Sequence, residues 1–587
     1  MPQNIFFIPK YTDTYADAFT AFGLAGLLDR IFQQTKGPDT PRSIELVDTG
    51  GHYEIRLRQP LEEKWVENIS FFRSPAPYLT GQKEQEFPPD TTARDVDATW
   101  KQVRAYNEQR GALIEKGTRG TELEKQLEDQ EPPHDWQVVA FLGDWRMQAQ
   151  GIYNRFVSGW AQGRSHFSEH LQTILEWYSS ENPAQENILK KWVKLAKQDG
   201  ISYQDTASQL LNPHQGKGQN ESKANVLRMD NIKDRPWIEE MLKTIGLWHG
   251  LAPRQISDTK DWKAYVIAPR SIHWSALASA YRRFNKYLWR ERRGDATSLK
   301  TDITSILLFF RAWLDYVETE TEEEDDNFDA ETSNPQNVIQ GFYVVQFKLL
   351  SPNAYTMVNQ SFLGLPSWGS TIHTRRDLTE MKALIDEHLD VVRNLEESHS
   401  DGYDLLRYYR EFVAGENWQA FFDFTTGYAQ EILRRYNEGA KWVPTFTTIH
   451  LRRLFMSSKK PLSTILENQG FQNVAAAIRY STVVPQSRKA RQQDSLYDVR
   501  YGLGVAFKRK STVRDEFVSA LTDFMHMYNQ ENVQELENKG QQMRKDLRTS
   551  DIEEIIHLVD DYGSELVANL LVAYGYAREP REETPNS

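Results

Sequence analysis

Residues able to recognise a phosphate or a base edge gather in one polar stretch, LNPHQGKGQNESKAN, from Leu211 to Asn225. The stretch holds two glycines, two lysines, two glutamines and three asparagines. Its Gly-Lys-Gly triplet at 216–218 suggests a phosphate loop, but such a loop needs Ser or Thr after the lysine and a glycine five residues before the second glycine. Neither condition is met, because Gly218 follows the lysine and Leu211 occupies the other position.

Two interpretations of this stretch remain open. Gly, Asn, Pro and Ser are the usual residues of a surface loop, and that is the simpler interpretation. The second interpretation is a loop that contacts DNA. Asn and Gln side chains pair a donor with an acceptor, Lys holds phosphates, and Gly lets the backbone approach closely.

Few other residues suggest chemistry. His134-Asp135 is a pair of the kind used by metal-dependent nucleases, but it precedes a helical pattern in which Asp135 suits an N-cap. The segments at 387–390 and 557–561 fall in helical patterns, and we expect their charged residues on exposed faces. The acidic run from Glu318 to Glu331 is expected to be a solvated loop or linker. No zinc-protease, hydrolase-elbow or dinucleotide motif occurs. We therefore predict no catalytic residue, metal or cofactor, with a metal-dependent nuclease as the alternative.

Two basic surfaces are candidates for contacts with a nucleic-acid backbone. The first is a predicted helix from Ala276 to Arg293, in which aromatic and basic residues alternate. A solvated basic face is the alternative. The candidate residues on this helix are Arg282, Arg283, Lys286 and Arg290.

The second basic surface lies in the C-terminal part. From Met456 to Arg514 there are eleven Lys or Arg and three carboxylates, a net +8, whereas 515–587 carries six Lys or Arg and sixteen Asp or Glu, a net −10. This polarity suits a bundle that follows a nucleic-acid strand on one side or stacks head to tail with its copies, and uneven surface charge is the alternative. The candidate strand-binding residues are Arg479, Arg488, Lys489, Arg491, Lys508, Arg509 and Lys510.

The elements that carry these residues predict an α+β fold. Alternating runs on both sides of Gly50-Gly51 predict a β-hairpin, and the patterns of AYVIAP and GFYVVQFKLLS predict strands. The middle is mainly helical and the end is predicted to be a helical bundle, in which Ser550 is the predicted N-cap of a helix with Glu553 as its capping-box partner. We predict a mixed N-terminal domain over 1–375, a helical connector over 376–455 and a bundle over 456–587.

Composition sets the broad class. The chain has 587 residues, no cysteine and a net charge of −13. A chain of this length exceeds one core, and the absence of cysteine excludes disulfides and thiolate zinc sites. No apolar run of about 18 residues and no basic leader is present, so we expect a cytoplasmic protein without a membrane span or secretory signal.

Several segments resemble one known family. NPHQGKGQNESKAN, PWIEEMLKTIGLW and KDWKAYVIAPRSI are similar to the large subunit of type I CRISPR surveillance complexes (Cascade) of the I-B-like, cyanobacterial branch. FQNVAAAIRYSTVVPQSRKA and the segments YDVRYGLGVAFKRKSTVRDEFVSALTDFMHMYN and YGSELVANLLVAYGYAR resemble the small-subunit-like bundle fused to such large subunits. Together these segments cover a minority of the chain.

The resemblance implies a non-catalytic subunit. It reads the short duplex motif beside the target (the PAM), helps to open the duplex and stabilises the resulting R-loop, while base pairing with the guide reads the sequence. The implied partners are the guide CRISPR RNA, target double-stranded DNA, the backbone and foot subunits of Cascade, separate small subunits, and a helicase-nuclease or transposition proteins. A protein-binding helical scaffold is a further alternative. The resemblance makes the polar stretch the candidate PAM reader, through Lys217, Gly218, Gln219, Asn220 and Lys223.

Met456 stands immediately before the predicted bundle. The resemblance implies an internal translation start there, which would release the bundle as a separate small subunit.

Overall fold

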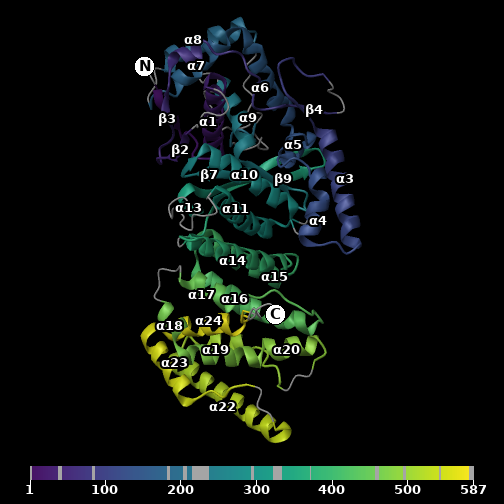
Figure 1. Ribbon diagram of the computed structural model, residues 1–587, viewed down its shortest axis with the longest axis vertical. Coiled ribbons are helices and arrows are strands. Elements are labelled where there is room, and N and C mark those ends of the chain that lie inside the picture. Colours follow the sequence, from purple (N-terminus) through teal and green to yellow (C-terminus); the bar gives the residue numbers. More distant parts are fainter. Residues whose placement is uncertain are drawn as a thin grey trace, which may run out of the picture. The chain divides into compact units, whose positions relative to one another are not determined.

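The fold is described from a computed structural model (Figure 1). It describes residues 3–36, 43–81, 86–181, 185–201, 208–213, 237–291, 296–320, 333–369, 372–456, 462–493, 497–540 and 544–580. The chain divides into two compact units. The first comprises 1–298, 315–320 and 335–364, and the second comprises 299–314, 321–334 and 365–587. The predicted α+β class is confirmed, with sheets in the N-terminal region and helices in the middle and at the C-terminus.

The first unit contains two four-stranded sheets and a small parallel pair of strands. One sheet has the order β1-β3-β2-β8 and the other β10-β9-β7-β6. The predicted hairpin is β2 and β3, which pair antiparallel with Asp48 opposite Tyr53. Both predicted strands are confirmed as β7 and β9, which pair antiparallel. The strands are β1 (Gln3–Pro9), β2 (Ile44–Asp48), β3 (His52–Leu61), β4 (Tyr78–Thr80), β5 (Ala93–Asp95), β6 (Leu251–Gln255), β7 (Trp262–Pro269), β8 (Ser271–His273), β9 (Ile339–Ser351) and β10 (Ala354–Gly364).

Helices pack around these sheets. The helix α1 is buried along most of its length, because its sequence is apolar on nearly every face. The helices of this part of the chain are α1 (Tyr15–Lys36), α2 (Glu63–Glu67), α3 (Val96–Glu115), α4 (Gly120–Leu127), α5 (Trp136–Leu142), α6 (Gln150–Gln162), α7 (Phe167–Trp177), α8 (Gln185–Gln198), α9 (Trp237–Gly250), α10 (Trp274–Arg290), α11 (Ser298–Glu320, shared by the two units) and α13 (Pro335–Val338).

The helices α1 and α9 touch backbone to backbone at two glycines. A Cβ atom added at Gly246 would lie 1.8 Å from the carbonyl oxygen of Phe19, and one added at Gly23 would lie 1.9 Å from that of Leu242. Side chains at these positions would push the helices apart, so the core of the first unit depends on the two glycines.

We expect Gly246→Ala to lower the free energy of unfolding by about 1–3 kcal/mol, because the added methyl group overpacks the contact. The same change at Gly111, in the exposed middle of α3 with no atom near its position, should be neutral or stabilising by up to about 1 kcal/mol. Urea denaturation followed by tryptophan fluorescence measures both. Equal behaviour of the two variants would contradict the close packing.

The described residues of the second unit from 372 to 580 form helices joined by loops, with one isolated β-bridge between Thr447 and Arg578. Aromatic side chains form its core, and the ring of Phe421 lies 4.4 Å from that of Phe412 and 5.8 Å from that of Phe455. The helices are α14 (Arg375–Arg393), α15 (Ser400–Gly415), α16 (Trp418–Asn437), α17 (Thr448–Met456), α18 (Ser463–Glu467), α19 (Gln469–Ser481), α20 (Val483–Ala490), α21 (Leu503–Lys510), α22 (Arg514–Lys539), α23 (Thr549–Tyr562) and α24 (Ser564–Gly575). The helix α16 packs against α20, α21 and α24, so the segments at 376–455 and 456–587 share one core.

The predicted N-cap of α23 is wrong. The helix begins at Thr549, which places Ser550 inside its first turn, and the N-cap is Arg548. The carboxylate of Asp551 accepts a hydrogen bond from the backbone N–H of Arg548 at 2.7 Å. The aspartate, and not Glu553, is thus the acidic partner of the N-cap.

Candidate nucleic-acid interface

The candidate PAM-reading residues lie outside the described part of the chain. They are Lys217, Gly218, Gln219, Asn220 and Lys223, within the segment 214–236. The residues on either side of this segment are described, and they establish how its two flanks are attached to the first unit.

A buried polar cluster joins the two flanks of the segment. Asn212 donates from its side-chain nitrogen to Glu240 in the first turns of α9 at 2.9 Å. Lys243, one turn further along, donates to the side-chain oxygen of Asn212 at 2.6 Å and pairs with Glu240 at 2.7 Å. All three side chains are buried, so their mutual bonds compensate the cost of removing them from water. The two flanks of the segment 214–236 are therefore fixed at the same place.

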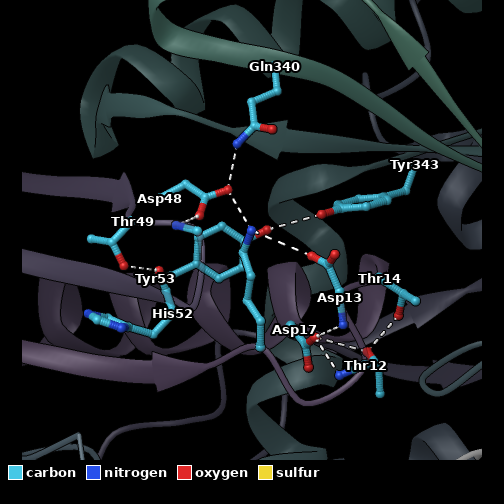
Figure 2. A network of polar contacts seen from close by, with 12 residues as sticks. Thr12, Asp13, Thr14, Asp17, Asp48, Thr49, His52, Tyr53, Gln340 and Tyr343 are labelled. Atoms are coloured by element: carbon cyan, nitrogen blue, oxygen red, sulfur yellow. Dashed lines mark hydrogen bonds and ion pairs between the residues drawn. The ribbon is translucent and has the colours of Figure 1, made fainter.

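The cluster of Asn212, Glu240 and Lys243 interacts electrostatically with Asp17, near the turn between β1 and α1. The carboxylate of Asp17 accepts bonds from the backbone N–H groups of Thr12, at 2.9 Å, and Asp13, at 2.7 Å, as Figure 2 shows. Burial raises the pKa of Asp17, and the bonds from Thr12 and the positive charge of Lys243 oppose that rise. The lysine thus lies within electrostatic reach of both carboxylates, Asp17 and Glu240.

A second buried cluster ties the two sheets together (Figure 2). Asp48, at the hairpin turn, pairs with Lys10 at 2.6 Å and accepts from Gln340 of β9 at 2.5 Å. The hydroxyl groups of Tyr53 and Tyr343 lie 3.4 Å apart. Burial lowers the pKa of Lys10, but the hydrogen bond and charge of Asp48 outweigh burial and raise it overall. The amine therefore stays charged at neutral pH and fixes Asp48, and the hydrogen bond from Gln340 to Asp48 joins the two sheets, so the cluster has a structural role.

The basic face of α10 is largely neutralised within the first unit. Lys286 pairs with Glu131 at 2.6 Å, and Arg290 pairs with the same carboxylate at 2.5 Å. Arg283 donates to the hydroxyl of Thr319 at 3.0 Å. Arg282 is exposed, and its side chain donates to a backbone carbonyl of its own helix. Arg282 and Arg283 therefore keep charges with no ion-pair partner among the described residues, and of these two Arg282 is the more exposed.

Two of the predicted strand-binding residues of the bundle have internal partners. Arg479 is buried and donates to the carbonyl oxygens of Tyr574, at 2.9 Å, and Ala577, at the end of α24. Its assignment to a nucleic-acid strand is therefore wrong, because a buried guanidinium with these partners fixes a helix end. Lys508 is half-buried and pairs with Asp423 of α16.

The remaining predicted residues of the bundle are available to a ligand. Among the described residues, four basic side chains of α20 and α21 have no carboxylate within ion-pair distance: Arg488, Lys489, Arg509 and Lys510. Lys489 and Arg509 are exposed, and Arg488 and Lys510 are half-buried. The two helices follow one another in the chain and both pack on α16, and uncompensated cations of this kind can bind a phosphate backbone.

An aromatic residue that sequence reasoning missed stands beside this surface. Arg491, just after α20, is exposed and donates to the carbonyl oxygen of Lys441 at 3.1 Å. Trp442 follows Lys441 and is 53% exposed. Burial raises the pKa of Tyr436, and the charges of Arg491 and Arg578 oppose that rise, so both cations lie near this phenol. An exposed indole among cations is a platform on which a nucleic-acid base stacks. In the sequence, the adjacent residues Lys441 and Trp442 were the available sign of this aromatic contact.

The candidates for metal chemistry are separated in the structure. Asp135 occupies the N-cap position of α5, as predicted, but its carboxylate pairs with Arg94 at 3.0 Å instead of capping the helix. The expected exposure of 387–390 is wrong for Glu387 and His388, which are buried. Glu387 accepts from the backbone N–H of Thr447, a tertiary contact that sequence periodicity cannot reveal. Among the described residues, no group of three or more His, Asp or Glu is arranged to hold a metal.

Met456 is the last residue of α17 and is exposed. Phe455, immediately before it, packs its ring 6.1 Å from that of Tyr574 in α24. A product that began at Met456 would lack α16 and almost all of α17, and it would expose the faces of α20, α21 and α24 that pack on α16. The internal start stays a prediction, and such a product needs another surface to cover those faces.

No protein family, curated protein or solved structure matches the chain. Within the described residues, no helix combines the length and the apolar character that crossing a bilayer requires.

Proposed function

We propose that the chain is the non-catalytic large subunit of a cytoplasmic RNA-guided complex of the Cascade type. In this role it recognises the PAM duplex, helps to open it and holds a DNA strand along its C-terminal helices. Its partners are the guide CRISPR RNA, the target DNA, the backbone, foot and small subunits, and a helicase-nuclease or transposition proteins. Two observations support this proposal. The sequence resembles the large subunit of Cascade complexes, and four basic residues of α20 and α21 have no carboxylate partner among the described residues.

The observation that carries the proposal is the set of cations on and just after α20, together with an exposed tryptophan next to a residue that one of them contacts. Arg488, Lys489 and Arg491 have no partner carboxylate among the described residues, and an exposed indole stands next to Lys441, whose carbonyl Arg491 contacts. Cations hold phosphates and the indole stacks a base, so this combination suits a single strand better than a protein partner. The polar cluster of Asn212, Glu240 and Lys243 supports the role of the loop, because it anchors both of its flanks.

A charge-removal experiment tests the strand contact. The variant Arg488→Ala, Lys489→Ala, Arg491→Ala should bind single-stranded DNA more weakly, and the slope of log K against log salt should become shallower by about 0.7 for each phosphate that is no longer neutralised. Fluorescence anisotropy with the full-length chain at several salt concentrations measures the slope. Lys545→Ala removes an exposed charge from the acidic part of the same unit and should leave the slope unchanged. An unchanged slope in the triple variant would mean that these cations are solvated, and a scaffold that binds only protein would then be favoured.

A further inference from the structure

A cavity of about 530 Å³ opens in the first unit, and the proposed function does not use it. Its walls come from α10, from the residues just before α5, from the end of α9 and from the segment that leads into β5. The volume falls within the range of about 300–1,000 Å³ that small-molecule pockets occupy. Its charged and polar lining residues include Asp29, Arg94, His134, Asp135 and Arg282, and its tryptophans are Trp248 and Trp274.

One wall is polar and carries hydrogen-bonding groups in fixed positions. The carboxylate of Asp135 is held by Arg94 at 3.0 and 3.4 Å and is otherwise mostly shielded from water. Burial lowers the pKa of His134, and the charges of Arg282 and Arg94 lower it further against the opposing charge of Asp135. The imidazole is therefore neutral at pH 7, with one nitrogen to donate and one to accept.

Aromatic side chains also line the cavity, and among them the ring of Tyr281 meets that of His134 edge-on, with ring centroids 6.5 Å apart. Trp248 donates its indole N–H to the hydroxyl of Tyr153 at 2.9 Å, and Tyr281 donates its hydroxyl to the carbonyl of Leu251 at 2.6 Å. These bonds fix the two rings, and Trp274 packs edge-on against His249 with ring centroids 4.7 Å apart. Rigid aromatic rings already in place bind a flat ligand without a further loss of side-chain entropy.

Arg282 adds a cation to this cavity. Its guanidinium is exposed and donates to the carbonyl of Ala278 in its own helix at 3.2 Å. Among the described residues no carboxylate lies within ion-pair distance of it. Its charge helps to lower the pKa of His134, so the cation lies within electrostatic reach of the polar residues of the cavity.

We propose that this cavity binds a nucleotide. The base lies against Trp248 and Trp274, its polar edge faces Asp135 and His134, and its phosphate is held by Arg282. A carboxylate only accepts hydrogen bonds, so Asp135 favours bases with an exocyclic amino group, as in cytosine, adenine and guanine, over uracil, whose polar edge offers a single ring N–H between two carbonyl oxygens that Asp135 repels. This cavity contains none of the cations of α20 and α21, so nucleotide binding here and strand binding there can be tested independently.

The ligand has two possible sources with the same chemistry, a free nucleotide and the terminal nucleotide of a strand. Isothermal titration of the full-length protein with CMP, AMP and UMP, with the matching nucleosides, and with a 5′-phosphorylated trinucleotide separates them. We expect CMP or AMP to bind more tightly than UMP and than the nucleosides. Tighter binding of the trinucleotide than of any mononucleotide assigns the site to a strand end, and the reverse order assigns it to a free nucleotide.

Two variants tie the binding to the cavity. Arg282→Ala removes a charge-assisted hydrogen bond and should weaken binding of the phosphorylated ligands about tenfold or more, while leaving the nucleosides unchanged. Asp135→Asn should abolish the preference for amino-bearing bases. Lys101→Ala removes an exposed charge from α3, outside the cavity, and should change neither. The triple variant Arg488→Ala, Lys489→Ala, Arg491→Ala should bind mononucleotides as the parent does, which distinguishes this site from the strand contact.

Arg282 is exposed on a well-formed helix, so its variant is expected to fold even if Asp135→Asn does not. Failure of every nucleotide to bind at millimolar concentration would overturn the proposal. Binding that both Arg282→Ala and Asp135→Asn leave unchanged would overturn it as well.

Discussion

Replacing Arg479 by alanine is expected to lower the free energy of unfolding of the second unit by about 2–5 kcal/mol, because the carbonyl of Ala577 loses its side-chain donor, that of Tyr574 loses one of two donors, and the packing of a buried side chain is lost. The guanidinium, 6% exposed, donates to the carbonyl oxygens of Tyr574 and Ala577 and pairs with Glu579. The carbonyl of Tyr574 lies in the last turn of α24, where it also accepts from the backbone N–H of Ala577 at 3.3 Å, and the carbonyl of Ala577 lies just after the helix. Water cannot replace the side chain without opening the packing between α19 and α24.

Urea denaturation measures this destabilisation, and two variants calibrate it. Arg479→Lys keeps the positive charge but loses the planar guanidinium group with its several N–H donors, so it should recover only part of the stability. Lys489→Ala, at an exposed position of α20, should change stability by less than about 0.5 kcal/mol. If Arg479→Ala left stability unchanged and weakened DNA binding instead, the arginine would regain its assignment to a nucleic-acid strand.

The second large effect is expected at the loop that holds Gln219 and Asn220. Replacing both by alanine should weaken binding of the assembled complex to PAM-containing duplex targets by about 1–3 kcal/mol for each base edge that is no longer hydrogen-bonded. A target with a pre-opened bubble should be affected much less, because it needs no unwinding at the PAM.

Electrophoretic mobility shifts with the two targets measure this difference. Ser222→Ala alters a neighbouring polar residue of the same loop and should leave the ratio of the two affinities unchanged. An equal loss of affinity on both targets, or no loss on either, would show that the loop does not read the PAM.

Local patterns predicted the elements of the fold. Alternating residues around Gly50-Gly51 indicated the β2–β3 hairpin, and continuous apolar runs indicated β7 and β9. The alternation reports the two-residue period of a strand, and the apolar runs report a short buried strand through their length and their β-branched and aromatic residues. The start of α23 was missed, because the choice between Arg548 and Ser550 as the N-cap, and so between Asp551 and Glu553 as its acidic partner, depends on how the chain enters the helix.

The state of each charge could not be predicted from the sequence, because it depends on distant partners. Lys286 and Arg290 look alike and exposed on a helical wheel, but Glu131 arrives from far upstream in the chain and neutralises both. Arg479 is buried by the end of α24. The nucleotide cavity has the same origin, since Arg94, Asp135 and Arg282 come from separate segments of the chain that only the fold brings together.

The central claim is that this chain lets a guide-loaded complex open PAM-flanked duplex DNA. The most direct measurement compares complexes assembled from guide RNA and backbone subunits with and without the chain, on a matched duplex and on the same sequence with a pre-opened bubble. We predict that omitting the chain abolishes binding to the duplex and leaves most binding to the bubble, and that the purified chain with divalent metal cleaves neither. Equal duplex binding with and without the chain, or metal-dependent cleavage by the chain alone, would contradict the account.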